Sequence, residues 1–354
     1  MFDQLTKTPT VDEALLLEEV EVKLMDVLAE ERPRWRTIDV DGDLVTVLEG
    51  FLSRGGKRLR PSFCMCGYVA AGGDHDAVSA AVRVAAALEL LHAFALIHDD
   101  VMDGSDTRRG EPSVQTVHSA SHQRAAGAGE ARRFGEGIAV LAGDLAHVLA
   151  ERLMLEAPRH VRARWHEMQV ELVLGQTLDL VGTAYRRVDM GRAREIAVLK
   201  SGRYSVVHPL VLGALAADRS DLVAGLEAFG EPVGEAFQLR DDLMGAFGSS
   251  VETGKPVGDD LCEGKPTMLL AYGRELTRGA DAVLLRNVGR IDMDDSTLRQ
   301  VQEVLERCGA RGLVERRVDD LAAEAFDRLD GLVIDAAARE SLARLAQRAI
   351  WRTS

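Results

Sequence analysis

The chain has 354 residues, and its 57 acidic against 43 basic side chains give a formal net charge of −14 at pH 7. A hydrophobic content of 46% excludes a disordered chain, and the acidic balance argues against a nucleic-acid binder, because binding to phosphate backbones relies on clustered cations. Residues 84–97 form the most apolar stretch, but Glu89 and His92 interrupt it and it is too short to cross a bilayer, so no transmembrane segment is predicted.

Helical periodicity dominates the chain, and no sustained alternation of apolar and polar residues indicates strands. The first predicted helix covers residues 12–31 and is halted by Pro33; a long helix over 76–103 follows, with Asp74 or Asp76 as its N-cap. Further helices are predicted over 138–157, 161–183, 192–217, 221–245, 267–278, 296–308, 311–330 and 336–351. Length alone favours about two domains of roughly 150 residues, but no shift in composition marks a boundary. We therefore expect an all-α fold with one large domain over residues 1–354.

Two segments between the predicted helices are expected to be loops. Residues 119–137 are rich in Gly, Ala and Arg, which favours a mobile loop. Residues 246–266 are rich in glycine and charged side chains and are too long for a simple connection. Because long loops in compact domains are usually functional, we expect this second loop at the active site.

The cysteines and the first residues bear on the cellular compartment. Cys64, Cys66, Cys262 and Cys308 show neither a CxxC pair nor a disulfide framework, which suits a reducing compartment. Residues 1–22 are acidic and lack the basic region followed by an apolar region that a signal peptide needs. A cytoplasmic protein is therefore expected.

An acidic pattern occurs twice, each time at the end of an apolar helix. AFALIHDDVM contains Asp99, and AFQLRDDLMG contains Asp241 in the matching position. Asp99 and Asp103 share a helix face and lie about 6 Å apart along the axis, so they could bind Mg²⁺ and leave coordination sites for water and phosphate oxygens. A single copy could equally be a solvated helix end capped by Arg108 and Arg109, but two copies favour a metal site.

Basic residues are scarce and gather in a few places. RGGKRLRP contains Arg54, Lys57, Arg58 and Arg60, while Arg108 and Arg109 follow the first acidic pattern. Lys200 opens KSGRYS, and Lys255 and Lys265 flank the pair Asp259 and Asp260. Lys and Arg bind phosphates directly, so clusters of both signs favour a diphosphate that is bridged to carboxylates by Mg²⁺. No nucleophile–base triad is evident.

These patterns together resemble the trans-isoprenyl diphosphate synthases, also called polyprenyl synthetases. Six motifs follow one another in the order of that family: GGKRLRP, LIHDDVMDGSDTRRGEPSV, GQTLDL, KSGRYS, FQLRDD and GKPVGDDLCEGKPT. The sequence around both acidic motifs is most similar to that of bacterial geranylgeranyl diphosphate synthases. The resemblance implies a helical bundle around a central cavity, a homodimer, and three Mg²⁺ ions per active site. The substrates it implies are isopentenyl diphosphate and an allylic diphosphate.

The resemblance also implies roles for individual residues. The metal would be held by Asp99, Asp100, Asp103, Asp241 and Asp242. The allylic diphosphate would be bound by Arg108, Lys200, Lys255 and Lys265, with Ser201 and Gln238 at the reacting centre. Isopentenyl diphosphate would be bound by Lys57, Arg60, His92 and Arg109. Gln176 and Asp179 would orient an arginine or metal-bound water.

The implied reaction is ionisation of the allylic diphosphate, condensation with isopentenyl diphosphate and loss of a proton. One departure from the family pattern is Gly245, where a third aspartate of the second acidic motif often stands. One carboxylate is therefore missing, and Asp242 or Asp260 could replace it.

Product length should depend on the residues before Asp99. Ala95 lies on the same helical stripe and leaves room for a prenyl tail, while Phe94 lies roughly 140° away on a helical wheel. An aromatic residue at position 94 suits a C20 product in the family, although Phe94 could equally be ordinary core. We expect geranylgeranyl diphosphate, with a farnesyl or longer-chain synthase as alternatives. A class I terpene cyclase would lack the GGKRLRP cations, and a non-catalytic subunit of a heteromeric synthase would fit only if Gly245 reflects decay.

Overall fold

The chain folds into one almost entirely helical domain, which confirms the all-α expectation and excludes the two-domain alternative. A computed structural model describes residues 13–35, 43–74, 77–248, 258–289 and 293–351. Its helices are α1 (Glu13–Trp35), α2 (Leu44–Ser53), α3 (Leu59–Ala70), α4 (Ser79–Asp103), α5 (Val114–Arg124), α6 (Ala131–Met154), α7 (Arg159–Tyr185), α8 (Met190–Ile196), the π-helix η2 (Ala197–Val207), α9 (His208–Ala216), the 3₁₀-helix η3 (Ser220–Leu222), α10 (Val223–Phe247), α12 (Asp259–Glu263), α13 (Met268–Leu276), α14 (Gly279–Asn287), α15 (Asp295–Arg307), α16 (Ala310–Asp330) and α17 (Ala336–Ile350).

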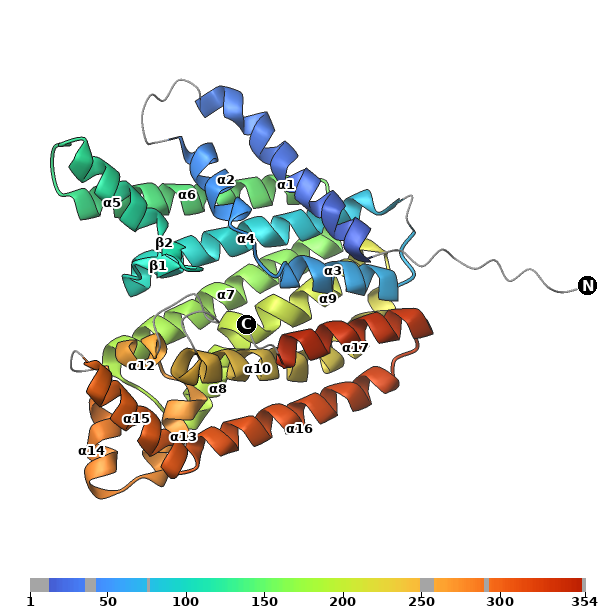
Figure 1. Cartoon of the computed structure of the whole chain (residues 1–354). Coiled ribbons are helices and arrows are strands. Elements are labelled where there is room, and N and C mark those ends of the chain that lie inside the picture. The colour runs from blue at the N-terminus through green and yellow to red at the C-terminus, as the bar shows by residue number, and fades with distance from the viewer. Residues whose placement is uncertain (1–12, 36–42, 75–76, 249–257, 290–292, 352–354) are drawn as a thin grey trace, which may run out of the picture.

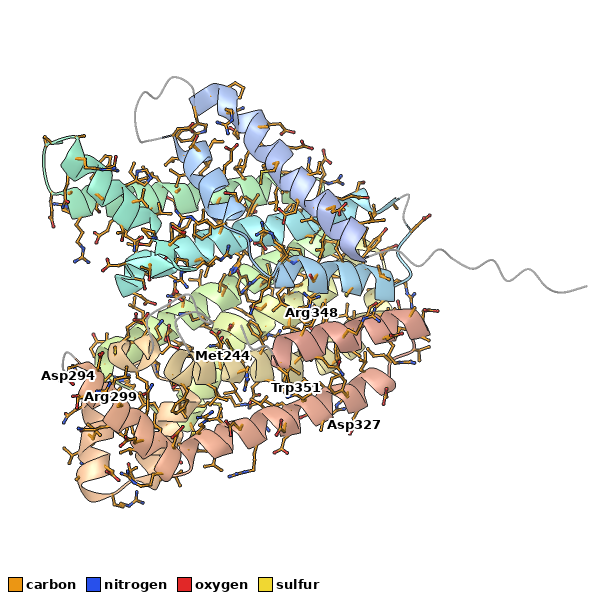
Figure 2. All side chains as sticks on the ribbon, in the orientation of Figure 1. Met244, Asp294, Arg299, Asp327, Arg348 and Trp351 are labelled. Carbon is orange, nitrogen blue, oxygen red and sulfur yellow. The ribbon has the colours of Figure 1, made fainter. Side chains whose placement is uncertain are left out.

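Three long helices run through the middle of the molecule. Figure 1 shows α4, α7 and α10 there, with α1, α2, α5 and α6 above α4 in this view and α13 to α16 below α10. Side chains follow the same division: Met244 on α10 lies near the middle, whereas Asp327 lies on the outer helix α16 (Figure 2). The centre of the bundle is therefore bounded by the C-terminal halves of α4 and α10.

Helix α4 is the core helix of the domain. By length and composition alone it could span a membrane, with a mean hydropathy of 1.8, but 67% of its most apolar window is buried within the protein. Four of its alanines, Ala81, Ala85, Ala86 and Ala87, are fully buried and let α3 and α6 approach closely. A helix that is apolar on all sides is expected when neighbouring helices surround it.

The N-terminal boundaries differ from the predictions in detail. Helix α1 continues through Pro33 to Trp35, because a proline in the last turn removes only one hydrogen bond near the helix end. Helix α4 begins at Ser79 rather than at residue 76, and Asp76 lies outside the described residues. Helices α2 and α3 were not predicted, because each is short and almost continuously apolar, so neither shows a clear period.

The loop predicted over residues 119–137 is wrong for most of its length. Helix α5 extends to Arg124 and α6 begins at Ala131. The small residues that suggested a loop instead allow the two helices to pack: a Cβ on Gly135 would lie 2.8 Å from the backbone nitrogen of Ser119. Before α5, a short antiparallel hairpin pairs β1 (Thr107–Arg108) with β2 (Glu111–Pro112). Of the second predicted loop, 246–266, residues 249–257 lie outside the described residues, and α12 forms part of the rest.

The helix predicted over 192–217 is three consecutive helices, of which the middle one is the π-helix η2. Close packing on both sides holds η2 in place. A Cβ on Gly175 of α7 would lie 2.6 Å from Cα of Lys200, and one on Gly234 of α10 would lie 2.8 Å from Cα of Gly202. Glycine at these positions lets η2 insert between α7 and α10, and π-helices often occur at functional sites.

Candidate active site

A cavity of about 610 Å³ lies between the C-terminal ends of α4 and α10, and it collects most of the predicted site residues. Its lining includes Lys57, Arg60, His92, Ala95, Asp99, Arg108, Arg109, Gln176, Asp179, Lys200, Ser201, Gln238, Asp241, Asp242 and Lys265. Asp100, Asp103 and Phe94 are not part of this lining, and Lys255 lies outside the described residues. The structure therefore brings together side chains that are up to about 200 positions apart in the sequence.

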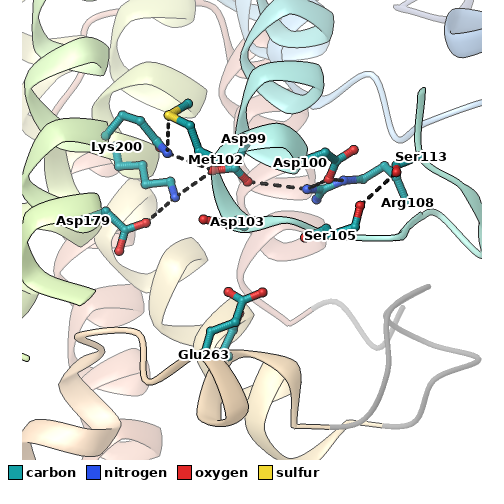
Figure 3. Close-up of polar contacts among 12 residues, drawn as sticks. Asp99, Asp100, Met102, Asp103, Ser105, Arg108, Ser113, Asp179, Lys200 and Glu263 are labelled. Carbon is teal, nitrogen blue, oxygen red and sulfur yellow. Dashed lines mark hydrogen bonds and ion pairs between the residues drawn. The ribbon is translucent and has the colours of Figure 1, made fainter. Parts of the chain in front are cut away.

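Asp99 at the end of α4 is surrounded by donors (Figure 3). Its Oδ1 accepts hydrogen bonds from Lys200 Nζ at 3.1 Å and Gln176 Nε2 at 3.0 Å, and its Oδ2 lies 3.4 Å from Arg108 Nη2. Burial raises the pKa of Asp99, but the positive charges of Lys200, Lys265 and Arg108 outweigh burial and lower it well below the usual range. The carboxylate is therefore ionised.

Asp103, one turn further along α4, faces α12. Its Oδ2 accepts a hydrogen bond from Lys265 Nζ at 2.9 Å, and the same ammonium group lies 3.0 Å from Glu263. Burial raises the pKa of Glu263 to about 7; Lys265 opposes this shift and the negative charge of Asp103 adds to it. Lys265 thus links the first acidic motif to the segment after α10.

Asp100 has a different position from its neighbours. It is 1% exposed, and its Oδ1 accepts hydrogen bonds from Nε of Arg108 at 2.8 Å and from Nη2 of the same side chain. Because Asp100 lies outside the cavity lining, its geometry suits holding Arg108 rather than binding metal. Asp179 holds Lys200 in a comparable way.

The two aspartates of the second acidic motif are also unequal. Asp241 is exposed at the cavity surface, whereas Asp242 is 6% exposed and accepts a hydrogen bond from Gln238 Nε2 at 2.7 Å. Burial raises the pKa of Asp242 well above the usual range, so this side chain differs from the ionised metal ligand that the resemblance implied. Its contact instead fixes the amide of Gln238 at the cavity.

Gly245 lies against Asp260, one of the two residues expected to replace the missing carboxylate. A Cβ on Gly245 would lie 3.0 Å from Cγ of Asp260 and closer still to its Oδ2. The carboxylate of Asp260 thus occupies the space that a side chain at position 245 would need.

A basic end of the cavity lies beside η2. Arg60 donates from Nη2 to Ser205 Oγ at 2.7 Å, and its guanidinium lies 4.3 Å from the centre of the Tyr204 ring. His92 Nδ1 lies 3.1 Å from the same Tyr204 hydroxyl. Burial and then the charges of Arg60 and Arg109 lower the pKa of His92 well below its usual value, so the imidazole is neutral. Sequence reasoning missed Tyr204 and Ser205, although both lie within the motif KSGRYS.

The two candidate chain-length residues face different surroundings. Ala95 lines the cavity, one turn below Asp99. Phe94 instead stacks on His147 of α6, with ring centroids 5.0 Å apart, and meets the edge of His98 at 4.7 Å. In this geometry Phe94 supports the wall between α4 and α6 and is not the floor of the described cavity.

The acidic side chains fit a magnesium site. In the described parts of the chain no three His, Cys, Asp or Glu side chains converge on one point, so a closed all-protein metal cage is not formed there. Mg²⁺ commonly binds through one or two carboxylates and keeps its other positions for water and substrate phosphates. Asp99 and Asp241 at the cavity and Asp103 beside Lys265 provide such oxygen ligands on facing helices.

Comparison with known proteins agrees with this geometry. The polyprenyl synthetase family model matches residues 42–306. A short chain isoprenyl diphosphate synthase of Methanothermobacter thermautotrophicus is 30% identical over 92% of this chain and 97% of that protein. A geranylgeranyl diphosphate synthase of Mycobacterium tuberculosis is 37% identical over 60% of this chain and 57% of that protein.

Solved structures give the same result. A geranylgeranyl pyrophosphate synthase of Corynebacterium glutamicum, crystallised with isoprenyl diphosphate and magnesium, superposes with a TM-score of 0.92 and is 34% identical over 97% of this chain and 100% of that chain. The chain therefore belongs to the polyprenyl synthetase family.

Proposed function

We propose that this trans-isoprenyl diphosphate synthase condenses isopentenyl diphosphate with an allylic diphosphate (dimethylallyl, geranyl or farnesyl diphosphate) to form geranylgeranyl diphosphate. The observation that supports the proposal is one cavity with a group of cations at each end. At the end that contains Asp99 and Asp241, which we call the acidic end, the cations are Lys200, Arg108 and Lys265. At the basic end beside η2 they are Lys57, Arg60 and Arg109. Such a cavity would fit two diphosphates: the allylic diphosphate, which leaves in the reaction, and that of isopentenyl diphosphate, which stays in the product.

Mg²⁺ would be held by Asp99, Asp103 and Asp241, with Asp260 beside them. When bound, and we propose three ions per site, the metal supplies the positive charge that makes the allylic diphosphate a good leaving group. Arg108 and Lys200 would donate hydrogen bonds to the same diphosphate, because both already point into the acidic end. Asp100 and Asp179 keep these two cations in place.

The middle of the cavity would shield and orient the reacting carbons. Leu96, Leu172 and Ile196 line its wall and exclude water from the allylic cation. Ser201 and Gln238 present polar groups there, and Asp242 holds the Gln238 amide in one orientation. The proton released at the end would pass to the departed diphosphate.

The proposal of a C20 product is supported by the small Ala95, which lines the cavity one turn below Asp99 and leaves room for a prenyl tail. A C15 or longer product remains the alternative. The cations of the basic end disfavour a terpene cyclase, which binds no isopentenyl diphosphate. The retained Asp99, Asp103 and Asp241 disfavour a non-catalytic subunit.

We also propose a homodimer in the cytoplasm. Helices α6 and α7 are linked by hydrogen bonds from Trp165 and Gln169 to Glu151, and both expose large apolar side chains. These include Leu141, Val148, Val170, Val173 and Leu174, which are 47–69% exposed. A face of this kind favours burial against a second copy.

The test is to incubate the purified protein with Mg²⁺, labelled isopentenyl diphosphate and a C5, C10 or C15 primer, and to size the products. We expect diphosphate release and products that stop at C20. A sharp stop at C15, or products well beyond C20, would contradict the chain length. Asp241→Ala should abolish most turnover, and near-wild-type activity of this variant at saturating Mg²⁺ would contradict the assignment of the metal site.

A further inference from the structure

Arg58 lies between the two residues that would bind isopentenyl diphosphate, Lys57 and Arg60, but its own side chain is already engaged. It is 13% exposed, and its Nη1 donates to Glu89 Oε1 at 2.5 Å. Its Nε and Nη2 donate to Glu21, and Nη2 also donates to the carbonyl oxygen of Leu52 at 3.0 Å. Four of the five guanidinium N–H groups are thus used within the protein, which leaves little capacity for a substrate.

The backbone at Arg58 is in an unusual conformation. Its φ of +46° and ψ of 36° lie in the left-handed region, which non-glycine residues rarely adopt, and it is the N-cap of α3. Gly55 at φ +77° and Gly56 at φ +158° precede it. Such a conformation persists only where surrounding contacts hold it. The bonds from Arg58 to α1, α2 and α4 are those contacts, and they fix the direction in which the flanking residues leave the turn.

Glu89 is the buried partner in this arrangement. It is 3% exposed on α4 and lies in the cavity lining together with Lys57, Arg60 and Arg109. A buried carboxylate is retained only when it is paired, and here the charge of Glu89 acts on both Arg58 and Arg109. Glu21, the other partner of Arg58, is 41% exposed on the outer side.

We propose that Arg58 and Glu89 form a positioning pair that aims Lys57 and Arg60 at the diphosphate of isopentenyl diphosphate without touching it. This inference depends on the proposed function, since it presumes that Lys57 and Arg60 bind that substrate. The pair acts on one substrate only, because Lys200, Arg108 and Lys265 of the other end are held by different acids.

The test compares Arg58→Gln, Glu89→Gln and the double variant in steady-state kinetics. We expect the KM for isopentenyl diphosphate to rise roughly 10- to 100-fold, because a displacement near 1 Å at a binding group is costly. The KM for farnesyl diphosphate and the kcat at saturation should stay within about threefold, and the double variant should be no worse than the more severe single variant. Titration calorimetry with isopentenyl diphosphate alone gives a readout that does not depend on turnover. If Arg58→Gln fails to fold, Arg58→Lys takes its place and should show a smaller rise, since lysine keeps the charge but not the fork.

Glu31→Gln is the matched control. Glu31 is 5% exposed on α1 and pairs with Arg34 and Arg152, and none of the three lines the cavity, so its loss should lower the melting temperature and leave both KM values unchanged. Folded Arg58 and Glu89 variants with unchanged affinity for isopentenyl diphosphate would overturn the inference, as would equal rises in both KM values. If the wild-type protein forms no prenyl diphosphate at all, the proposed function fails instead, and the two failures are distinguishable.

Discussion

The substitution Gly175→Ala adds a single methyl group and should impair catalysis more than folding. It is buried on α7 and opens the motif GQTLDL, and η2 crosses it so closely that a Cβ would lie 2.6 Å from Cα of Lys200 and 2.8 Å from the carbonyl carbon of Leu199. Ordinary contacts of a Cβ begin near 3.4 Å. Gly175→Ala must therefore push the two helices apart by about 1 Å, because both atoms belong to the backbone and cannot rotate away.

The expected cost is larger for the reaction than for the fold. A misplacement of about 1 Å at a catalytic group can cost about 100-fold in rate, which corresponds to about 2.7 kcal/mol in activation free energy. Overpacking destabilises a protein by about 1–3 kcal/mol. With an unfolding entropy of about 2.1 cal/mol/K per residue, such a loss lowers the melting temperature of this chain by only about 1–4 °C.

The assay measures kcat with saturating isopentenyl and farnesyl diphosphates, together with thermal unfolding. Gly50→Ala is the control, because Gly50 is also helical, on α2, but a Cβ there would meet nothing within 4 Å. It should keep full activity and gain up to about 1 kcal/mol from helix propensity. A Gly175→Ala protein with turnover within about twofold of wild type would refute the argument that the position of η2 sets the position of Lys200.

Three further predictions concern stability, product length and assembly. Burial raises the pKa of Glu171, but hydrogen bonds from His208 and Arg203 lower it to about 2. The free energy of unfolding should therefore fall by at most about 3 kcal/mol as the pH drops from about 4.5 to about 2. Urea unfolding of Glu171→Gln should show a smaller fall over the same pH range. Ala95→Phe narrows the cavity one turn below the metal site, so product sizing should show C10 or C15 compounds; unchanged C20 would mean that the tail passes elsewhere. Val173→Arg places a charge on the proposed dimer face, where Val173 is 58% exposed, and light scattering should report a folded monomer; a persistent dimer would place the interface on other helices.

Much of this protein could be predicted from local patterns. The periodicity of apolar residues indicated an all-α fold, because a helix repeats its environment every three to four residues whatever surrounds it. Asp99 and Asp103 could be placed on one face for the same reason, and the motif around Lys200 placed this residue among the candidate site residues that line the cavity. Small residues in 119–137 were misjudged, because glycine and alanine mark both loops and tight helix–helix contacts.

The differences between equivalent residues depend on the tertiary structure. Asp241 and Asp242 are neighbours in one motif and both line the cavity, yet Asp241 is exposed whereas Asp242 is buried and bonded to Gln238, and burial raises the pKa of Asp242. Phe94 and Ala95 are also neighbours, but only Ala95 lines the cavity. Whether a side chain is ionised, and whether it lines the cavity, depends on the residues that other helices pack around it. Periodicity describes only its neighbours along the chain. The sequence by itself thus determined most of the helices, the acidic and basic motifs and the kind of chemistry, and the packing of α7, η2 and α10 decided which side chains of each motif line the cavity.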